Sequence, residues 1–160
     1  MKKTLIIASA VIVFVLAGII MYKFWPKKNE GAKVESPQIK YSQIKIGSQE
    51  IKAEVVDNEE TRIKGLSGRD SLSNNEGMLF VFEKPDIYPF WMKDMKFAID
   101  IIWIKDKKIV DIVKDAQPPT VDGKTITYTP RAEADLVLET VAGFCNENGV
   151  KIGDDISISN

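Results

Sequence analysis

The chain has 160 residues, of which 44% are hydrophobic and 28% charged, with a formal net charge of −1, one cysteine and no histidine. Without histidine, neither Ser-His-Asp nor Cys-His catalytic machinery nor the usual zinc sites can be built, and the lone Cys145 excludes an intramolecular disulfide. We therefore predict neither a metal nor a cofactor.

The chain begins with an apolar segment. Thr4 to Tyr22 carries no charge, and as a helix it would extend about 28 Å, close to the roughly 30 Å hydrocarbon core of a bilayer. The small-x-small triplet Ala8-Ser9-Ala10 lies near the start of this run, whereas a signal peptidase would need it at the end. We therefore predict that residues 1–25 are an uncleaved transmembrane signal anchor rather than a cleaved signal or a buried core helix.

Charge and composition then divide the chain near Pro37. Residues 26–37 (PKKNEGAKVESP) resemble a flexible tether, and residues 1–37 hold six Lys and two Glu, a net charge of +4. Residues 38–160 hold 16 Lys or Arg and 21 Asp or Glu, a net charge of −5, which counts against a nucleic-acid partner. Lys2 and Lys3 directly precede the apolar run, so we expect the domain of residues 38–160 to lie outside the cytoplasm, at the cell membrane.

The domain opens with strand patterns. Apolar and polar residues alternate over Ile39 to Ile46 and over Gln49 to Val56, which predicts a hairpin turning at Gly47-Ser48. A short helix over Asn58 to Lys64 follows, with Asp57 as its predicted cap and Gly65 at its end.

Seven further runs rich in β-branched and aromatic residues predict strands. They are Met78–Phe82, Tyr88–Met92, Ile99–Ile104, Lys108–Val113, Thr125–Thr129, Ala134–Glu139 and Ile156–Ser159. Such spacing is typical of a sandwich or small barrel. A second helix is expected over Thr140 to Asn148, capped by Thr140 and closed by Gly149, with Cys145 buried on it.

Several short motifs occur in a specific order. They are Gly65-Leu66-Ser67-Gly68-Arg69, Gly77-Met78-Leu79-Phe80, Phe90-Trp91-Met92-Lys93, Asp100-Ile101-Ile102-Trp103-Ile104, Val137-Leu138-Glu139 and Gly153-Asp154. Over roughly Ile51 to Ser157 this set closely resembles domain-of-unknown-function family 192 (DUF192). The resemblance implies a compact β-sandwich of jelly-roll type, often placed after a signal or anchor segment, with no established activity. Asp94-Met95 and Trp103 depart from the more usual residues, which casts doubt only on a role for the position after Lys93.

The predicted fold is thus mainly β, a small β-sandwich or jelly-roll-like domain with one or two short helices behind a single transmembrane helix. Trp91 and Lys93 lie two residues apart and would share a strand face, while Met92 would point into the core. Together with Arg69 and Asp100 they are our candidate ligand-binding residues, on a concave face that could hold a small anionic or glycan-like ligand. The alternative is a structural Arg69–Asp100 ion pair with Trp91 in the core.

The glycines of the motifs have a simpler explanation than phosphate binding. Gly65, Gly68, Gly77 and Gly153 are expected at turns and helix caps, because no strand, glycine-rich loop and helix with a following Lys-Ser/Thr pattern is present.

Three functions remain open at this stage. We favour a non-enzymatic binding or accessory module for a small ligand or an envelope protein. The alternatives are a carboxylate-based hydrolase of the envelope and a purely structural role. A hydrolase would need a pair of acids, and the candidates are Glu76, Asp94, Asp100 and Glu139.

Overall fold

The computed structural model describes residues 39–159. The predicted transmembrane anchor (residues 1–25) and tether (residues 26–37) lie outside the described residues. Within residues 39–159, no helix is both long and apolar enough to cross a membrane.

The described chain forms strands with two short helices, as predicted. In order they are β1 Lys40–Ile46, β2 Gln49–Val56, α2 Glu59–Lys64, β3 Glu76–Asp86, β4 Phe90–Trp91, β5 Ile99–Lys105, β6 Lys108–Ala116, β7 Thr127–Tyr128, β8 Ala134–Val141, α3 Phe144–Glu147 and β9 Ile156–Ser159. The hairpin of β1 and β2 has the predicted turn, and each predicted strand is present. β3 is longer than expected, and β4 and β7 are shorter.

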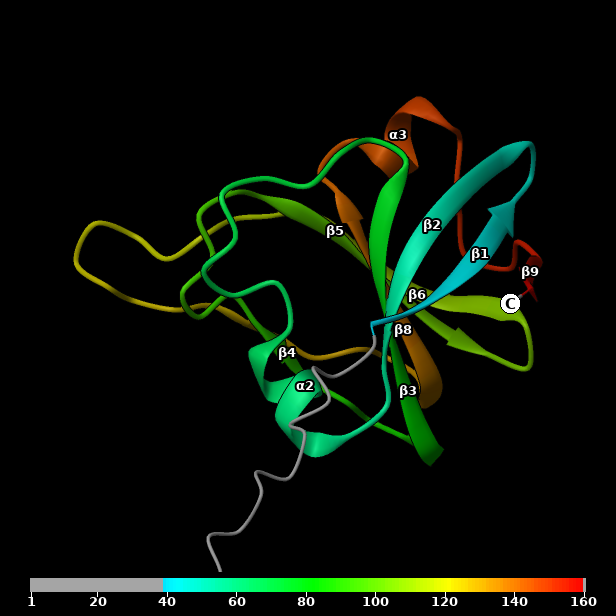
Figure 1. The fold of residues 1–160 in the computed structure, drawn as a ribbon, viewed down its shortest axis with the longest axis horizontal. Coiled ribbons are helices and arrows are strands. Elements are labelled where there is room, and N and C mark those ends of the chain that lie inside the picture. Colours follow the sequence, from blue (N-terminus) through cyan, green and yellow to red (C-terminus); the bar gives the residue numbers. More distant parts are fainter. Residues whose placement is uncertain (1–38, 160) are drawn as a thin grey trace, which may run out of the picture. The chain divides into compact units, whose positions relative to one another are not determined.

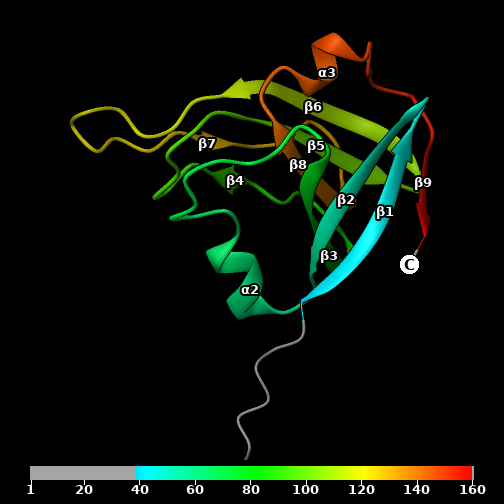
Figure 2. The same cartoon turned by 45° about the horizontal axis from the view of Figure 1, so that its top comes forward.

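The strands do not form the predicted sandwich. Seven of them make one sheet in the order β6-β5-β8-β3-β2-β1-β9, and β4 pairs with β7 in a separate small sheet, visible in Figures 1 and 2. Neighbours in the large sheet are antiparallel except β2 and β3, which are parallel and joined through α2. A sandwich and a single curled sheet bury alternating side chains alike, so the alternation could not distinguish them.

The large sheet curls until its two edge strands meet at one end. Lys108 of β6 forms a β-bridge with Asp155, just before β9. The Ile109 amide donates to the Asp154 carbonyl at 3.0 Å, and the Ile156 amide donates to the Lys107 carbonyl at 2.9 Å. These bonds pair edge groups that would otherwise be open to another chain.

The face inside the curl, which we call the inner face, buries an aliphatic core. Its buried members are Ile44, Ile46, Ile51, Ala53, Leu79, Ile102, Ile104, Ile109, Leu138, Phe144, Cys145, Val150 and Ile156. They come from every strand of the large sheet, from α3 and, for Val150, from the segment after α3, so α3 and this segment close the core.

The opposite, outer face buries a second core that is rich in aromatic residues and methionine. Its buried members are Val56, Leu66, Met78, Phe80, Met92, Met95, Ile99, Ile101, Trp103, Ala116, Ala134 and Val137. In β5, Ile99, Ile101 and Trp103 face this core, while Ile102 and Ile104 face the inner one. β5 is therefore covered on both faces, which explains its continuous apolar run.

Both helices differ from prediction at their ends. Asn58, not Asp57, caps α2 by accepting a hydrogen bond from the Thr61 amide at 3.0 Å. Asp57 instead forms an ion pair with Lys40 at 2.8 Å. α3 is only four residues long and begins after Gly143, because Thr140 belongs to β8. Cys145 is fully buried on α3, as predicted.

Gly77 is not the turn residue that the sequence suggested. It lies in β3, where an added Cβ would come within 2.8 Å of the Glu139 carbonyl oxygen. Gly65, Gly68 and Gly153 do have the positive φ angles (47°, 79° and 94°) expected at turns and caps.

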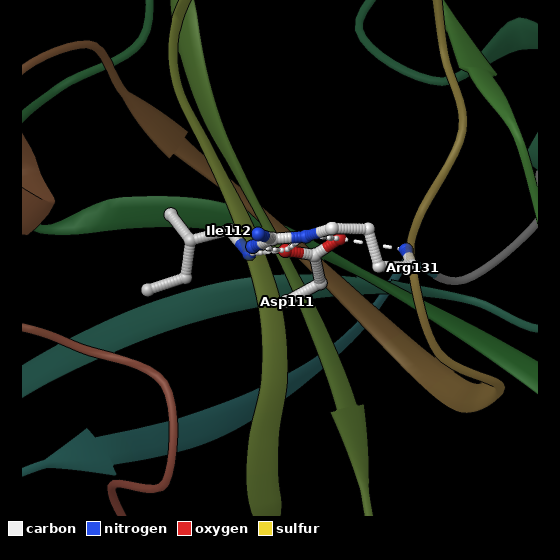
Figure 3. A network of polar contacts seen from close by, with 3 residues as sticks. All are labelled: Asp111, Ile112 and Arg131. Carbon is white, nitrogen blue, oxygen red and sulfur yellow. Dashed lines mark hydrogen bonds and ion pairs between the residues drawn. The ribbon is translucent and has the colours of Figure 1, made fainter.

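A polar clamp fixes the connection between β7 and β8 to the outer face of β6. The buried Asp111 carboxylate accepts hydrogen bonds from the Arg131 amide at 2.7 Å, from the Arg131 guanidinium and from the Ile112 amide at 2.9 Å (Figure 3). Burial acts to raise the pKa of Asp111, but these donors outweigh it and hold that pKa below its usual value of 3.8.

Candidate functional site

A pocket of about 410 Å³ lies between α2 and the outer face of β3 and β8. We call it the aromatic pocket. Its lining comprises Glu59, Arg62, Ile63, Lys64, Gly65, Leu66, Ser67, Phe80, Phe82, Tyr88, Pro89, Phe90, Trp91, Met95, Thr127 and Glu139. The pocket arises because α2 is only six residues long and has no buried residue, so it covers the outer face only partly.

Aromatic rings form its walls and hold one another in place. Phe80 and Phe90 meet edge to face with centroids 4.8 Å apart, and Phe82 stacks on Tyr88 at 3.7 Å. The Trp103 indole N–H donates to the Tyr88 carbonyl at 2.9 Å, which fixes the segment between β3 and β4. Such mutually packed rings give a preformed apolar wall.

Arg62 lies over one of these walls. Its Nη1 donates to the Val81 carbonyl at 2.8 Å, and its guanidinium carbon lies 5.1 Å from the centroid of the Phe82 ring. The hydrogen bond and the ring contact together fix Arg62 between α2 and β3.

Glu139 is the buried acid of the pocket. It lies on the outer face of β8, between its cross-strand neighbours Met78 and Ile101, and is 5% exposed. Among the described residues, no group donates a hydrogen bond to its Oε2. Burial raises the pKa of Glu139 to about 8, because the apolar surroundings disfavour the charged form and the nearby Arg69 offsets this only in part. At neutral pH this carboxyl is therefore mostly protonated.

Arg69 has a different partner from the one predicted. Its Nη2 binds Glu54 Oε2 at 2.6 Å, so the ion pair of Arg69 with Asp100, which was the structural alternative, is wrong. Glu54 and Glu139 both neighbour Met78, from β2 and β8 respectively. Arg69 thus neutralises one carboxylate directly while also acting on the second.

Asp100 lies on the inner face of β5, opposite to the pocket. Its carboxylate accepts hydrogen bonds from the backbone amides of Asp115 and Cys145, both at 2.8 Å, and from that of Gly143 at 3.3 Å. These bonds anchor α3 and a bulge of β6 to the sheet. The same surroundings, chiefly burial and secondly the Asp100 carboxylate, raise the pKa of the Cys145 thiol, which makes it a poor nucleophile. Asp100 is thus a structural residue, and the structure does not bring it to Trp91.

Trp91 and Lys93 do come together. Trp91 lines the pocket and is 52% exposed, which contradicts its alternative placement in the core. Lys93 Nζ lies 5.7 Å from the centroid of the Trp91 ring, but Lys93 belongs to the turn after β4, so the two side chains do not share a strand face. Met92 between them is buried in the outer core, as predicted.

Comparison with known families assigns the fold. The model of DUF192, described as "Uncharacterized ACR, COG1430", matches residues 42–158. The chain belongs to the DUF192 family. No curated protein matches the chain.

Two solved structures resemble this DUF192 domain. One is a protein of unknown function from Novosphingobium aromaticivorans DSM 12444, with 26% identity and a TM-score of 0.67 over 78% of this chain and 89% of that one. The other is described as a putative transcription regulator from Sinorhizobium meliloti 1021, with 25% identity and a TM-score of 0.66 over 74% of this chain and 92% of that one.

The four acids predicted as hydrolase candidates are dispersed in this DUF192 domain. Glu76 is exposed and accepts a weak hydrogen bond from the Ser73 amide at 3.4 Å. Asp94 is exposed in a turn with φ 57°, where its carbonyl accepts from the Gly68 amide. With Asp100 on the inner face, Glu139 is the one of the four that lines the pocket. Within residues 39–159, no group of three or more His, Cys, Asp or Glu side chains could hold a metal ion.

Sequence reasoning missed most of the pocket wall of the DUF192 domain. Phe80, Phe82, Tyr88 and Phe90 were interpreted only as strand residues. One signal was available for Glu139, which shares a strand face with the buried Val137 and so places an acid among apolar residues. No signal in the sequence showed that α2 would leave the rings partly uncovered.

Proposed function

We propose that this DUF192 domain is a binding module for a small ligand with an apolar, ring-bearing body, held in the aromatic pocket. The volume, the aromatic walls and the small number of polar groups are those of ligand sites, which span roughly 300 to 1,000 Å³. The observation that carries the proposal is Glu139, whose buried Oε2 has no donor among the described residues. A buried acceptor without a partner costs about 1–3 kcal/mol, and a ligand can supply the missing bond.

The alternatives have less support. A carboxylate-based hydrolase needs two acids facing one bond, and three of the four candidates lie away from the pocket. A purely structural role predicts motif residues that are buried and satisfied by one another, as Asp100 is. Glu139 and the exposed Trp91 do not fit that description.

The proposed location rests on the sequence. Thr4 to Tyr22 would hold the module in the cell membrane, with the domain outside the cytoplasm, where it could serve an envelope partner. Protease added to intact cells should then digest the domain, while the same domain in inverted vesicles is sealed inside and protected. The reverse pattern would contradict this orientation.

A thermal-shift screen of the detergent-solubilised full chain tests the binding function. Single-ring compounds with neutral, cationic and anionic head groups should include some that stabilise the protein, by about 2.7 kcal/mol at a hundred times the dissociation constant. Trp91→Ala should abolish the shift, since Trp91 lines the pocket. Tyr41→Ala is the matched control, because Tyr41 is similarly exposed at 47% but lies on β1. A screen without any shift, or shifts that persist in Trp91→Ala, would count against the proposal.

A further inference from the structure

The aromatic pocket combines a buried acid with rings that already attract cations. We infer that its ligand is an organic cation, an amine with an apolar body, whose ammonium group binds the Glu139 carboxylate between the aromatic walls. This inference rests on the proposed function and narrows it to one class of ligand.

Glu139 supplies the first argument. A carboxylate accepts hydrogen bonds at about four lone-pair positions, shared between its two oxygens. No described residue donates a hydrogen bond to those of Oε2. An ammonium group is a pure donor, and bonds from charged donors to carboxylates are roughly twice as strong as neutral ones. Beside the ionised Glu139, a ligand carboxylate or phosphate would set acceptor against acceptor.

The pocket walls supply the second, independent argument. The electron-rich faces of aromatic rings attract cations. Two rings of the wall already lie beside a cation of the protein, Phe82 beside the Arg62 guanidinium and Trp91 beside Lys93 Nζ. The rings of Phe90 and Tyr88 have no such cation among the described residues and are partly exposed, so these two rings can receive the cation of a ligand, whereas Phe80 is buried.

The other charges near Glu139 leave room for a cation. Arg69, the cation that acts on Glu139, is bound to Glu54. From α2, Glu59, Arg62 and Lys64 also line the pocket, and Arg62 is held by the Val81 carbonyl. The bond to Val81 fixes Arg62 but leaves its charge, so α2 contributes a net charge of +1 to the pocket. Among the described residues none of these α2 side chains forms an ion pair with Glu139, and the carboxylate stays open to the cation of a ligand.

Binding of a cation should be coupled to the loss of a proton. Because Glu139 is mostly protonated at neutral pH, the carboxyl must give its proton to the solvent before it can pair with an ammonium group. Below the pKa of about 8, affinity for the cation should therefore fall by up to about tenfold per pH unit, with about one proton released per ligand.

Three ring-matched probes test the inference by isothermal titration calorimetry on the detergent-solubilised full chain. Benzylammonium, benzyl alcohol and benzoate share the phenyl ring and differ in the charge and hydrogen-bonding character of the head group. We expect benzylammonium to bind most tightly, and its affinity to rise by up to about tenfold per pH unit from pH 6 and to level off near the pKa of about 8. Titrations in buffers of different ionisation enthalpy should show the released proton.

Two variants test whether Glu139 causes the preference for the cation and its pH dependence. Glu139→Gln should lower the affinity for benzylammonium to that for benzyl alcohol and remove the pH dependence. Glu60→Gln, which changes an exposed acid of α2 outside the pocket lining, is the matched control and should retain both. If Glu139→Gln does not fold, the ranking of the probes and the pH dependence in the unmodified protein still decide.

The outcomes separate the two proposals. Tighter binding of benzyl alcohol or benzoate, lost in Trp91→Ala, would overturn the cationic ligand and leave a small-ligand module. Failure of benzylammonium to bind overturns the inference, and a blank result in the wider screen as well would overturn the binding function itself.

Discussion

The inner and outer faces of the large sheet bury similar numbers of side chains from the same central strands but differ in chemistry. The inner core is aliphatic apart from Phe144 and is closed by the meeting of β6 with the chain before β9 and by α3. Its buried acid, Asp100, has three backbone donors. The outer core holds Phe80, Trp103 and three methionines, and its buried acid Glu139 has an oxygen without a donor.

The two faces therefore hold acids of different kinds: Asp100 is structural, and Glu139 is a candidate functional residue. The two residues are near neighbours in the sheet, because Asp100 pairs with Thr140 and Ile101 pairs with Glu139. One step along a strand reverses the face, and with it the hydrogen-bond partners and the access to solvent. The two motifs that contain these acids therefore cannot be assigned to one site from sequence order alone.

The largest expected effect on the free energy of unfolding comes from a cavity created in the inner core. Ile102→Ala should lower the free energy of unfolding by about 2–5 kcal/mol, because Ile102 is fully buried and the closed core cannot collapse around the gap. Urea denaturation of the full chain measures this. Ile63→Ala, at an exposed position of α2, is the control and should change stability by less than about 0.5 kcal/mol. Equal effects would show that the inner core is not the rigid one.

The buried acid of the outer face should make stability depend on pH. The pKa of Glu139 rises from 4.5 to about 8 on folding, so between these values the folded chain binds more protons than the unfolded chain. Stability should then fall as pH rises through this window, by up to about 2.7 kcal/mol over two pH units. Glu139→Gln should remove this contribution to the slope, as denaturation series at pH 5, 6 and 7 would reveal. An unchanged slope would show that Glu139 is already ionised in the folded protein.

A substitution at Gly77 tests how closely β3 packs against β8. Gly77→Ala should cost about 1–3 kcal/mol, since the new methyl group would lie 2.8 Å from a backbone oxygen and 3.1 Å from Ile51 Cγ2. Thermal unfolding gives the comparison with Gly47→Ala, where the added Cβ meets nothing within 4 Å and only the positive φ of 59° opposes it. A milder effect at Gly77 than at Gly47 would mean that β3 and β8 can separate slightly.

The smallest effect concerns the clamp at the margin of the outer face. Asp111→Asn should destabilise the protein by about 1 kcal/mol at pH 7, because Asn keeps the shape but loses the charge that binds the mostly exposed Arg131. The pKa of Asp111 is lowered on folding, so its contribution is present above 3.8 and lost as pH falls through the lower folded value. The difference from the unmodified protein should therefore shrink in acid. Asp70→Asn, at an exposed ion pair, should have no measurable effect.

Sequence patterns predicted the strands well and their assembly poorly. Alternation marks a strand by its own side chains, so β1, β2 and β5 were found within one or two residues. The arrangement into one curled sheet depends on the pairing of β1 with β9 and of Lys108 with Asp155, contacts that no local pattern encodes. The cap of α2 was misplaced because Asp57 and Asn58 are both good capping residues and only the Lys40 pairing decides between them.

The candidate site was predicted in part. Trp91 and Lys93 were named together on the expectation of a shared strand face, and they do lie together, although Lys93 reaches the Trp91 ring from the turn after β4. Arg69 and Asp100 were wrongly paired, since their partners Glu54 and the α3 amides are distant in the sequence. Glu139 was named only as one acid among several, and its importance comes from burial, which depends on the packing of the whole outer face.

The closure of the sheet has a consequence for how the chain folds. Ile44 of β1 pairs with Ile158 of β9, so the strands that complete the curl are separated by more than a hundred residues. Contacts of such long range are slow to form, because the entropy of closing the intervening loop opposes them until they are made. During synthesis on the ribosome, β1 and β2 would emerge early, and the edge of β1 that pairs with β9 would stay unpaired until β9 has been synthesised. During that interval this edge of β1 is exposed to pairing with a neighbouring chain.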